Sequence, residues 1–182
     1  MHYLTVSFSH KNSDITAREK LAFTETSKEE ALATLTCEDT KISEAIIVST
    51  CNRVEILAST NDTAKASTEI FEMLSRHSGL SIEELEGRAD VFENEGAVHH
   101  LFAVTSSLDS VVIGETQIAG QIKDAFKFAY DRGHCSQKLS RVMHYAFKCA
   151  ADVRNQTEIA KKPISVASVA VDKAKKLFGK LD

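Results

Sequence analysis

The 182 residues are enough for one large domain or two small ones with a true hydrophobic core. A formal net charge of −4 excludes a molecule that attracts nucleic acid through its overall charge, so any RNA contact must use a local basic patch. The four cysteines are widely spaced without a C-x-x-C pair, which argues against a zinc knuckle and a disulfide framework. His134, Cys135, His144 and Cys149 lack the spacing of metal ligands, so no metal site is expected. The N-terminus has no signal-peptide pattern and no apolar run is long enough to span a membrane, so we expect a cytoplasmic protein.

Strand and helix patterns alternate in the first half of the chain. Strand patterns occupy residues 3–8, 43–49, 53–59 and 89–92, and helix patterns occupy residues 27–35 and 64–77. Ser27 and Glu30 suggest a capping box for the first helix, and Gly79 marks the end of the second. The order is that of the ferredoxin-like split βαββαβ fold. We therefore predict an α+β protein whose antiparallel sheet occupies about residues 1–93 and carries helices on one face.

From residue 94 onward the apolar residues recur at helical spacing. The stripe of the first helix contains Val98, Leu101, Phe102 and Thr105, and Asn94 is placed to cap it. Further stripes cover about residues 118–129, 139–153 and 167–178. We predict a helical bundle over about residues 94–160, which completes a domain of residues 1–160. Residues 161–182 are expected to begin a long connecting helix, and the apolar stripe at the end suggests that the natural chain continues.

A polar heptapeptide, residues 49–55, lies between two strand patterns and contains Cys51, Arg53 and Glu55. A lone Cys between strands is most often a small core residue. The alternative is a thiolate nucleophile, because the positive charge of Arg53 stabilises a thiolate and its planar guanidinium suits a carboxylate ligand. That combination favours attack on an acyl group of an acidic substrate.

Residues 106–117 mix an apolar run with Asp, Ser, Glu and Gln. Such a segment is either a loop whose polar groups satisfy its own backbone or the lining of a polar substrate pocket. His100 lies nearly opposite the apolar stripe of its helix, so it is either solvated or acts as an acid, base or electrophile near the thiol.

Basic residues concentrate in the region of the third bundle helix and its end. They are Lys138, Arg141, Lys148, Arg154, Lys161 and Lys162. A solvated helix face accounts for them, and contact with a phosphate backbone is the alternative.

Taken together, these segments resemble the glutamyl-tRNA reductase family. The heptapeptide of residues 49–55 is similar to the family signature. Three further groups agree in order and spacing: residues 10–11 with 18–23, residues 100–121, and Val153, Arg154 and Thr157 with residues 165–167. The departures lie in loops: residues 12–14 replace Thr-Ala-Pro, Ser9 replaces Asn and Ser107 replaces Gly.

The resemblance implies a reaction and a set of site residues. Cys51 would attack the ester of glutamyl-tRNA to form a glutamyl thioester, which NADPH reduces to glutamate 1-semialdehyde for tetrapyrrole biosynthesis. Arg53 would bind the substrate carboxylate with two hydrogen bonds, and His100 would polarise the thioester or donate a proton. The remaining substrate-binding residues would be Thr50, Asn52, Ser110, Glu115, Gln117 and Gln121.

The same resemblance makes the chain part of a larger NADPH-dependent oxidoreductase. The NADPH-binding domain and a dimerisation domain would follow residue 182, since no Gly-rich phosphate loop is present here. The full-length protein would be a homodimer that passes its aldehyde to an aminomutase, whereas this chain would be a monomer with at most esterase activity. Two other hypotheses remain: a module that binds RNA or protein, with Cys51 as packing, and a thiol hydrolase acting on a small acidic acyl compound.

Overall fold

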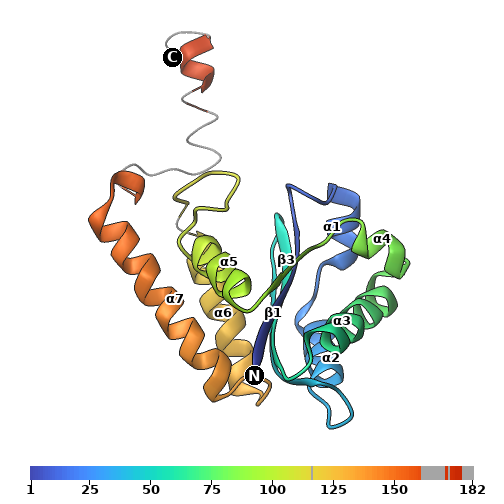
Figure 1. Ribbon diagram of the computed structural model, residues 1–182. Helices are drawn as coiled ribbons and strands as arrows, with labels where there is room; N and C mark the ends of the chain where they lie inside the picture. Colours follow the sequence, from blue (N-terminus) through green and yellow to red (C-terminus); the bar gives the residue numbers. More distant parts are fainter. Residues whose placement is uncertain (116, 161–170, 172, 178–182) are drawn as a thin grey trace.

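The computed structural model describes residues 1–115, 117–160, 171 and 173–177 (Figure 1). A four-stranded sheet stands between two groups of helices, with α1 to α4 on one face and α5 to α7 on the other (Figure 1). The sequence predicted helices on one face with a bundle beside the sheet. In the structure the bundle covers the second face.

The strands are β1 (His2–Ser9), β2 (Ile42–Ser49), β3 (Arg53–Thr60) and β4 (Asp90–Glu93). They lie in the order β2-β3-β1-β4 and every neighbouring pair is antiparallel, which confirms the ferredoxin-like prediction. Every residue of β3 is buried because helices cover both of its faces. Polar side chains at the ends of this strand are therefore held in the interior.

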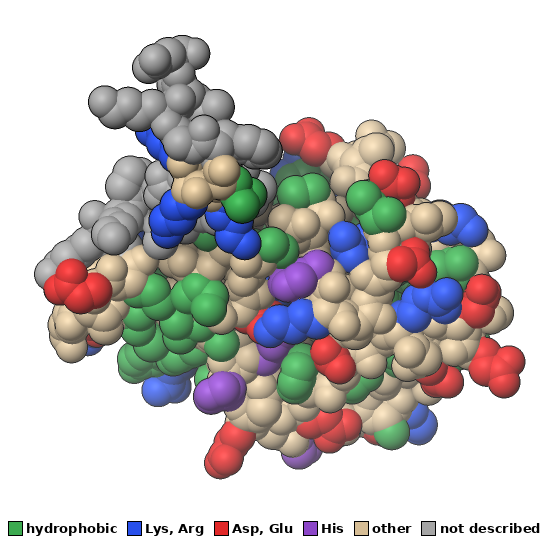
Figure 2. Space-filling view, turned by 90° about the horizontal axis from the view of Figure 1, so that it is seen from above, with side chains coloured by type: hydrophobic (Ala, Val, Ile, Leu, Met, Phe, Trp, Pro, Cys, Tyr) green, Lys and Arg blue, Asp and Glu red, His purple; other side chains and the backbone are tan. Residues whose placement is uncertain are grey.

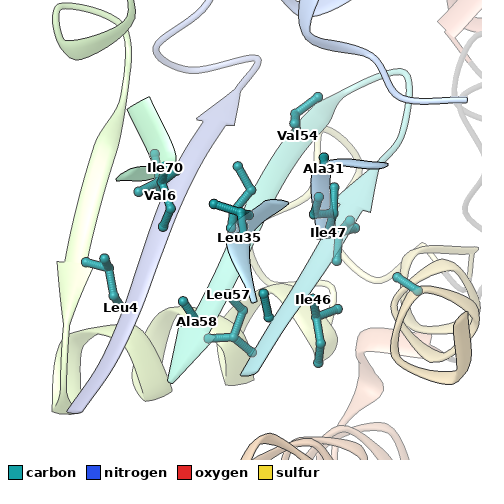
Figure 3. Close-up of a cluster of buried hydrophobic side chains, with 14 of the residues drawn as sticks. Leu4, Val6, Ala31, Leu35, Ile46, Ile47, Val54, Leu57, Ala58 and Ile70 are labelled. Atoms are coloured by element: carbon teal, nitrogen blue, oxygen red, sulfur yellow. The ribbon is translucent and has the colours of Figure 1, made fainter. Parts of the chain in front are cut away.

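Four helices cover the first face: α1 (Ile15–Leu21), α2 (Glu25–Leu35), α3 (Thr63–Ser78) and α4 (Ile82–Glu86). The capping box of α2 is formed by Thr24 and Ser27, so the helix begins two residues before the predicted Ser27. The end of α3 at Gly79 is confirmed, with φ of 72°. In the core shown in Figure 3, Ala31 and Leu35 of α2 lie over the strands that carry Ile47 and Val54.

The second face carries α5 (Glu95–Thr105), α6 (Gln117–Asp131) and α7 (Gln137–Gln156), and a short 3₁₀ helix follows at Glu158–Ala160. The buried stripe of α5 contains Ala97, Leu101, Val104 and Thr105, so the predicted stripe was rotated by about one position. Asn94 is the N-cap residue of α5, as predicted, but its side chain makes no capping hydrogen bond, because its side-chain oxygen lies 3.0 Å from Nδ1 of His2 instead. Most of the predicted connecting helix lies outside the described residues.

Glu44 of β2 joins the helical half to the sheet. Its carboxylate accepts hydrogen bonds from the backbone N–H groups of Ser136, Lys138 and Leu139 at 2.9–3.1 Å, and from the Ser136 hydroxyl at 2.7 Å. Burial raises the pKa of Glu44, but these hydrogen bonds outweigh burial and hold the pKa below its usual value. The Glu44 carboxylate therefore caps the N-terminus of α7 from a neighbouring element.

Within the described part of the chain, no helix is long and apolar enough to cross a membrane. The same residues contain no group of three or more His, Cys, Asp or Glu side chains arranged to hold a metal ion.

Candidate active site

The turn between β2 and β3 presents Cys51 to solvent. The Thr50 hydroxyl accepts hydrogen bonds from the backbone N–H groups of Asn52 and Arg53 at 3.2 and 3.1 Å, and the Thr50 N–H donates to the Arg53 carbonyl at 2.8 Å. These bonds fix a tight turn whose tip is the exposed Cys51. The alternative that Cys51 is a core packing residue is therefore wrong.

A small cavity of about 30 Å³ lies beside this turn. Its lining comes from the turn, from the α5–α6 loop and from the first turns of α6, which are about 60 residues further along the chain. The lining residues are Thr50, Cys51, Asn52, Arg53, Ser110, Val111, Glu115, Gln117, Ile118 and Gln121. The structure thus brings together every site residue predicted from the sequence except His100. Their individual roles stay predictions.

Arg53 is the most deeply buried polar side chain of this site, with 2% of its surface exposed. One terminal nitrogen donates to Oε1 of Glu55 at 2.5 Å, and the other donates to the backbone oxygen and to Oδ2 of Asp109, the latter at 3.1 Å. Two carboxylates therefore balance the charge that was expected to support the thiolate of Cys51. These contacts use three of the five guanidinium N–H donors.

Glu55 is the acceptor at the centre of the buried network. Besides Arg53, it receives the Ser7 hydroxyl at 3.1 Å and lies 3.0 Å from Nε2 of His100. Burial raises the pKa of Glu55, but the hydrogen bond and the charge of His100, followed by the charge of Arg53, lower it below the usual value. An ionised carboxylate only accepts hydrogen bonds, so Nε2 of His100 carries the hydrogen and Nδ1 is left for another partner.

His100 lies on the far side of this network from Cys51. Its ring stacks on Phe92 with 4.3 Å between centroids, and only 11% of its side chain is exposed. The solvated alternative for His100 is therefore wrong. It lines a neighbouring hollow of about 520 Å³ with Phe92, His99 and Asp109, and contacts Arg53 through Glu55 rather than the Cys51 cavity directly. The predicted role of His100 beside the thioester stays a prediction.

Sequence reasoning gave no role to Glu55, Asp109 or His10. Asp109 also accepts a hydrogen bond from Lys11, and although burial raises its pKa, the hydrogen bonds from Lys11 and Arg53 lower the pKa below its usual value. The backbone N–H of His10 donates to the Asn52 carbonyl at 3.1 Å. Burial and then the charges of Arg53 and Lys11 lower the pKa of His10, so its imidazole is neutral near pH 7.

The signal for His10 and Lys11 was present in the family-like segment of residues 10–11, but the contact of Lys11 with Asp109 in the α5–α6 loop, and of His10 with Asn52, needs the fold. Figure 2 looks down on this end of the sheet, where histidine, basic and acidic side chains lie next to one another near the middle of the face. The cations of the site, Lys11 and Arg53, are paired with the carboxylates of Asp109 and Glu55.

Comparisons with known proteins agree with this geometry. The family model described as "Glutamyl-tRNAGlu reductase, N-terminal domain" matches residues 6–157. Two proteins named glutamyl-tRNA reductase are similar to this chain. The one from Sulfurimonas denitrificans is 57% identical over 182 residues, and the one from Wolinella succinogenes is 59% identical over 181 residues. Each match covers 100% of this chain and 42% of the relative, so the chain spans about two fifths of their length.

A solved structure, glutamyl-tRNA reductase from Methanopyrus kandleri, is similar with a TM-score of 0.73 and 28% identity, over 98% of this chain and 41% of that one. The family resemblance inferred from the Cys51 heptapeptide is confirmed. The chain belongs to the glutamyl-tRNA reductase family and corresponds to its N-terminal domain.

Proposed function

We propose that this chain performs the acyl-transfer half of the glutamyl-tRNA reductase reaction. The Cys51 thiolate attacks the ester carbonyl of glutamyl-tRNA, the bond to the ribose oxygen breaks, and the tRNA leaves with a proton on that oxygen. The product is a glutamyl thioester on Cys51. The observation that supports this proposal is the exposed thiol on a rigid turn, beside a cavity lined by hydrogen-bonding side chains.

The polar lining is suited to hold an amino acid with a charged side chain. Glu115 offers an acceptor for the substrate amino group. The two N–H donors of Arg53 that Glu55 and Asp109 do not use are assigned to hydrogen bonds with the substrate carboxylate. Glu55 and Asp109 fix the guanidinium in one orientation, so little side-chain entropy is lost when a ligand binds. Selectivity for glutamate therefore follows from the fixed position of the Arg53 guanidinium.

The reduction step is assigned to the part of the full-length protein beyond this chain. NADPH would supply the hydride in the full-length enzyme, and this sequence contains no G-x-G-x-x-G motif for binding its phosphates. We further propose that the full-length protein is a homodimer that delivers glutamate 1-semialdehyde to an aminomutase in tetrapyrrole biosynthesis. This chain alone would release glutamate slowly as its thioester hydrolyses.

The test is deacylation of labelled glutamyl-tRNA by the 182-residue chain. Wild type should accelerate release of labelled glutamate, and Cys51→Ser should abolish the acceleration. Cys37→Ser is the matched control because Cys37 is the other exposed thiol. If Cys51→Ser, with an unchanged circular dichroism spectrum, deacylates as fast as wild type, the proposed function is wrong.

A further inference from the structure

An open groove of about 540 Å³ runs between α6 and α7, outside the cavity beside Cys51. Phe126 and Phe147 line it with 6.3 Å between ring centroids, and the ring of His144 meets Phe126 edge-on at 5.9 Å. Lys123 and Arg154 are exposed along the same groove. Aromatic rings bordered by cations form a surface suited to flat, negatively charged ligands.

The charge of the α6–α7 hairpin differs from that of the whole chain. Residues 117–157 contain seven Lys or Arg and three Asp or Glu, although the chain as a whole has a net charge of −4. Lys123 and Arg154 form no ion pair with any carboxylate among the described residues. Unpaired cations beside stacked aromatic rings match the phosphates and bases of a single-stranded nucleic acid, so this groove favours a polyanion.

Gly120 is exposed on α6 between the groove and the cavity. Added to Gly120, a Cβ atom would meet nothing within 4 Å, so packing inside this chain does not require a glycine. A glycine inside a helix lowers helix stability relative to alanine. It does allow a ligand to approach the backbone closely at this point.

The position of α6 links the groove to the site. Gln117 and Gln121, four residues apart, share the helix face that lines the Cys51 cavity, and Gly120 and Lys123 share the adjacent face that lines the groove. A flexible strand that leaves the cavity can therefore cross α6 over Gly120 and enter the groove. The acceptor end of a tRNA is such a strand, since its last nucleotides are unpaired.

We propose that the α6–α7 groove binds the unpaired 3′ nucleotides of the tRNA while the attached glutamyl group lies beside Cys51. Bases stack on Phe126 and Phe147, and Lys123 and Arg154 neutralise the phosphates. This inference rests on the proposed function, because it takes glutamyl-tRNA as the substrate. It also assigns a role to Arg154, one of the basic residues for which the sequence left two alternatives.

Binding of uncharged tRNA, followed by fluorescence anisotropy over a series of salt concentrations, tests the groove. Lys123→Gln and Arg154→Gln should each weaken binding and reduce the slope of log affinity against log salt by about 1. Phe147→Leu should weaken binding by about 5- to 150-fold, the loss expected for one stacked base. Lys65→Gln on α3, across the sheet, is the matched control and should leave affinity and slope unchanged.

Gly120→Ala separates binding from folding. It should raise the midpoint of thermal unfolding because alanine favours the helix, yet weaken tRNA binding because the methyl group blocks the crossing point. A short single-stranded RNA ending in CCA should compete for the wild-type groove. Unchanged tRNA affinity and salt slope in Lys123→Gln and Arg154→Gln would overturn the inference.

The proposed function is tested separately by acylation of wild-type Cys51 with a small glutamyl thioester that carries no RNA. If acylation fails while the groove variants still lose tRNA affinity, the groove stands and the proposed chemistry falls. If wild type deacylates glutamyl-tRNA and the groove variants do so with the same KM, the groove inference falls and the chemistry stands.

Discussion

Replacing Glu55 with Gln removes the charge at the centre of the buried network and turns one carboxylate oxygen into an NH2 donor. Gln has nearly the same shape and keeps a carbonyl oxygen as its acceptor. Wild-type Glu55 accepts hydrogen bonds from Arg53, Ser7 and His100, all of 3.1 Å or less. In the variant Arg53, with 2% of its surface exposed, keeps only Asp109 as a carboxylate partner. The buried guanidinium of Arg53 is then paired with one carboxylate in place of two.

Removing one partner of a buried ion pair costs about 3–5 kcal/mol. Because Asp109 still pairs with Arg53, we expect Glu55→Gln to lower the free energy of unfolding by about 3 kcal/mol. In a chain of this size that corresponds to a fall of about 6–12 °C in the thermal midpoint. The network would then rank among the larger single contributions to the stability of this domain.

The cost should depend on pH. The hydrogen bond from His100 and the charge of Arg53 outweigh burial, so the pKa of Glu55 in the folded state lies below the usual 4.5. A lowered folded-state pKa gives stabilisation that is fully present above the unfolded-state pKa and is lost as pH falls through the folded-state pKa. The difference between wild type and Glu55→Gln should therefore be full at pH 7 and narrow below about pH 4.5.

The assay is urea unfolding at pH 7 and at several lower pH values, with the slope m compared to confirm the same unfolding reaction. Glu38→Gln removes the same charge from an exposed position and is the matched control. A loss within about 0.5 kcal/mol of the control would refute the argument that Arg53 depends on buried carboxylates, since surface substitutions fall in that range.

Three further predictions concern other parts of the fold. Glu44→Ala should lower the free energy of unfolding by about 2 kcal/mol in urea titrations, because it removes four hydrogen bonds that cap α7; a loss below about 0.5 kcal/mol would contradict that role. Gly133→Ala should lower the free energy of unfolding by about 1 kcal/mol because Gly133 has positive φ. Gly114→Ala should lower it further, because Gly114 also has positive φ and its new Cβ would lie 2.3 Å from a backbone oxygen; equal thermal midpoints would refute this. Iodoacetamide at pH 7.5 should label the exposed Cys51 but spare Cys135, which is 2% exposed with its pKa raised by burial to about 11; peptide mass spectrometry showing equal labelling would contradict the packing.

The fold was largely predictable because its signals are local. Alternation in residues 3–8, the αL glycine at Gly79 and the strand runs on either side of Cys51 each depend on near neighbours in the sequence, and the ferredoxin-like order follows from them. The start of α2 was placed too late because Thr24 and Ser27 form the box in place of Ser27 and Glu30. The sequence fits a capping box at either position, and only the folded structure shows that Thr24 is the N-cap residue.

The sequence predicted which residues line the cavity but not how their charges are paired. The family-like motifs identified the residues that line the cavity, yet Arg53 was expected to lend charge to Cys51 and to a substrate. In the structure Asp109, which is 56 residues away, and Glu55 hold that charge. Likewise, Glu44 caps a helix that begins more than 90 residues later. Such pairings depend on tertiary contacts, and no pattern of spacing or composition reveals them.

The central claim is that Cys51 becomes acylated by glutamate, and trapping that adduct tests it most directly. The chain is mixed with labelled glutamyl-tRNA, quenched in acid within the first turnover, and separated from RNA under denaturing conditions. We predict label on the wild-type protein, release of that label by hydroxylamine, and no label on Cys51→Ser. Label that persists on Cys51→Ser, or wild-type protein that deacylates the tRNA without acquiring label, would contradict the account.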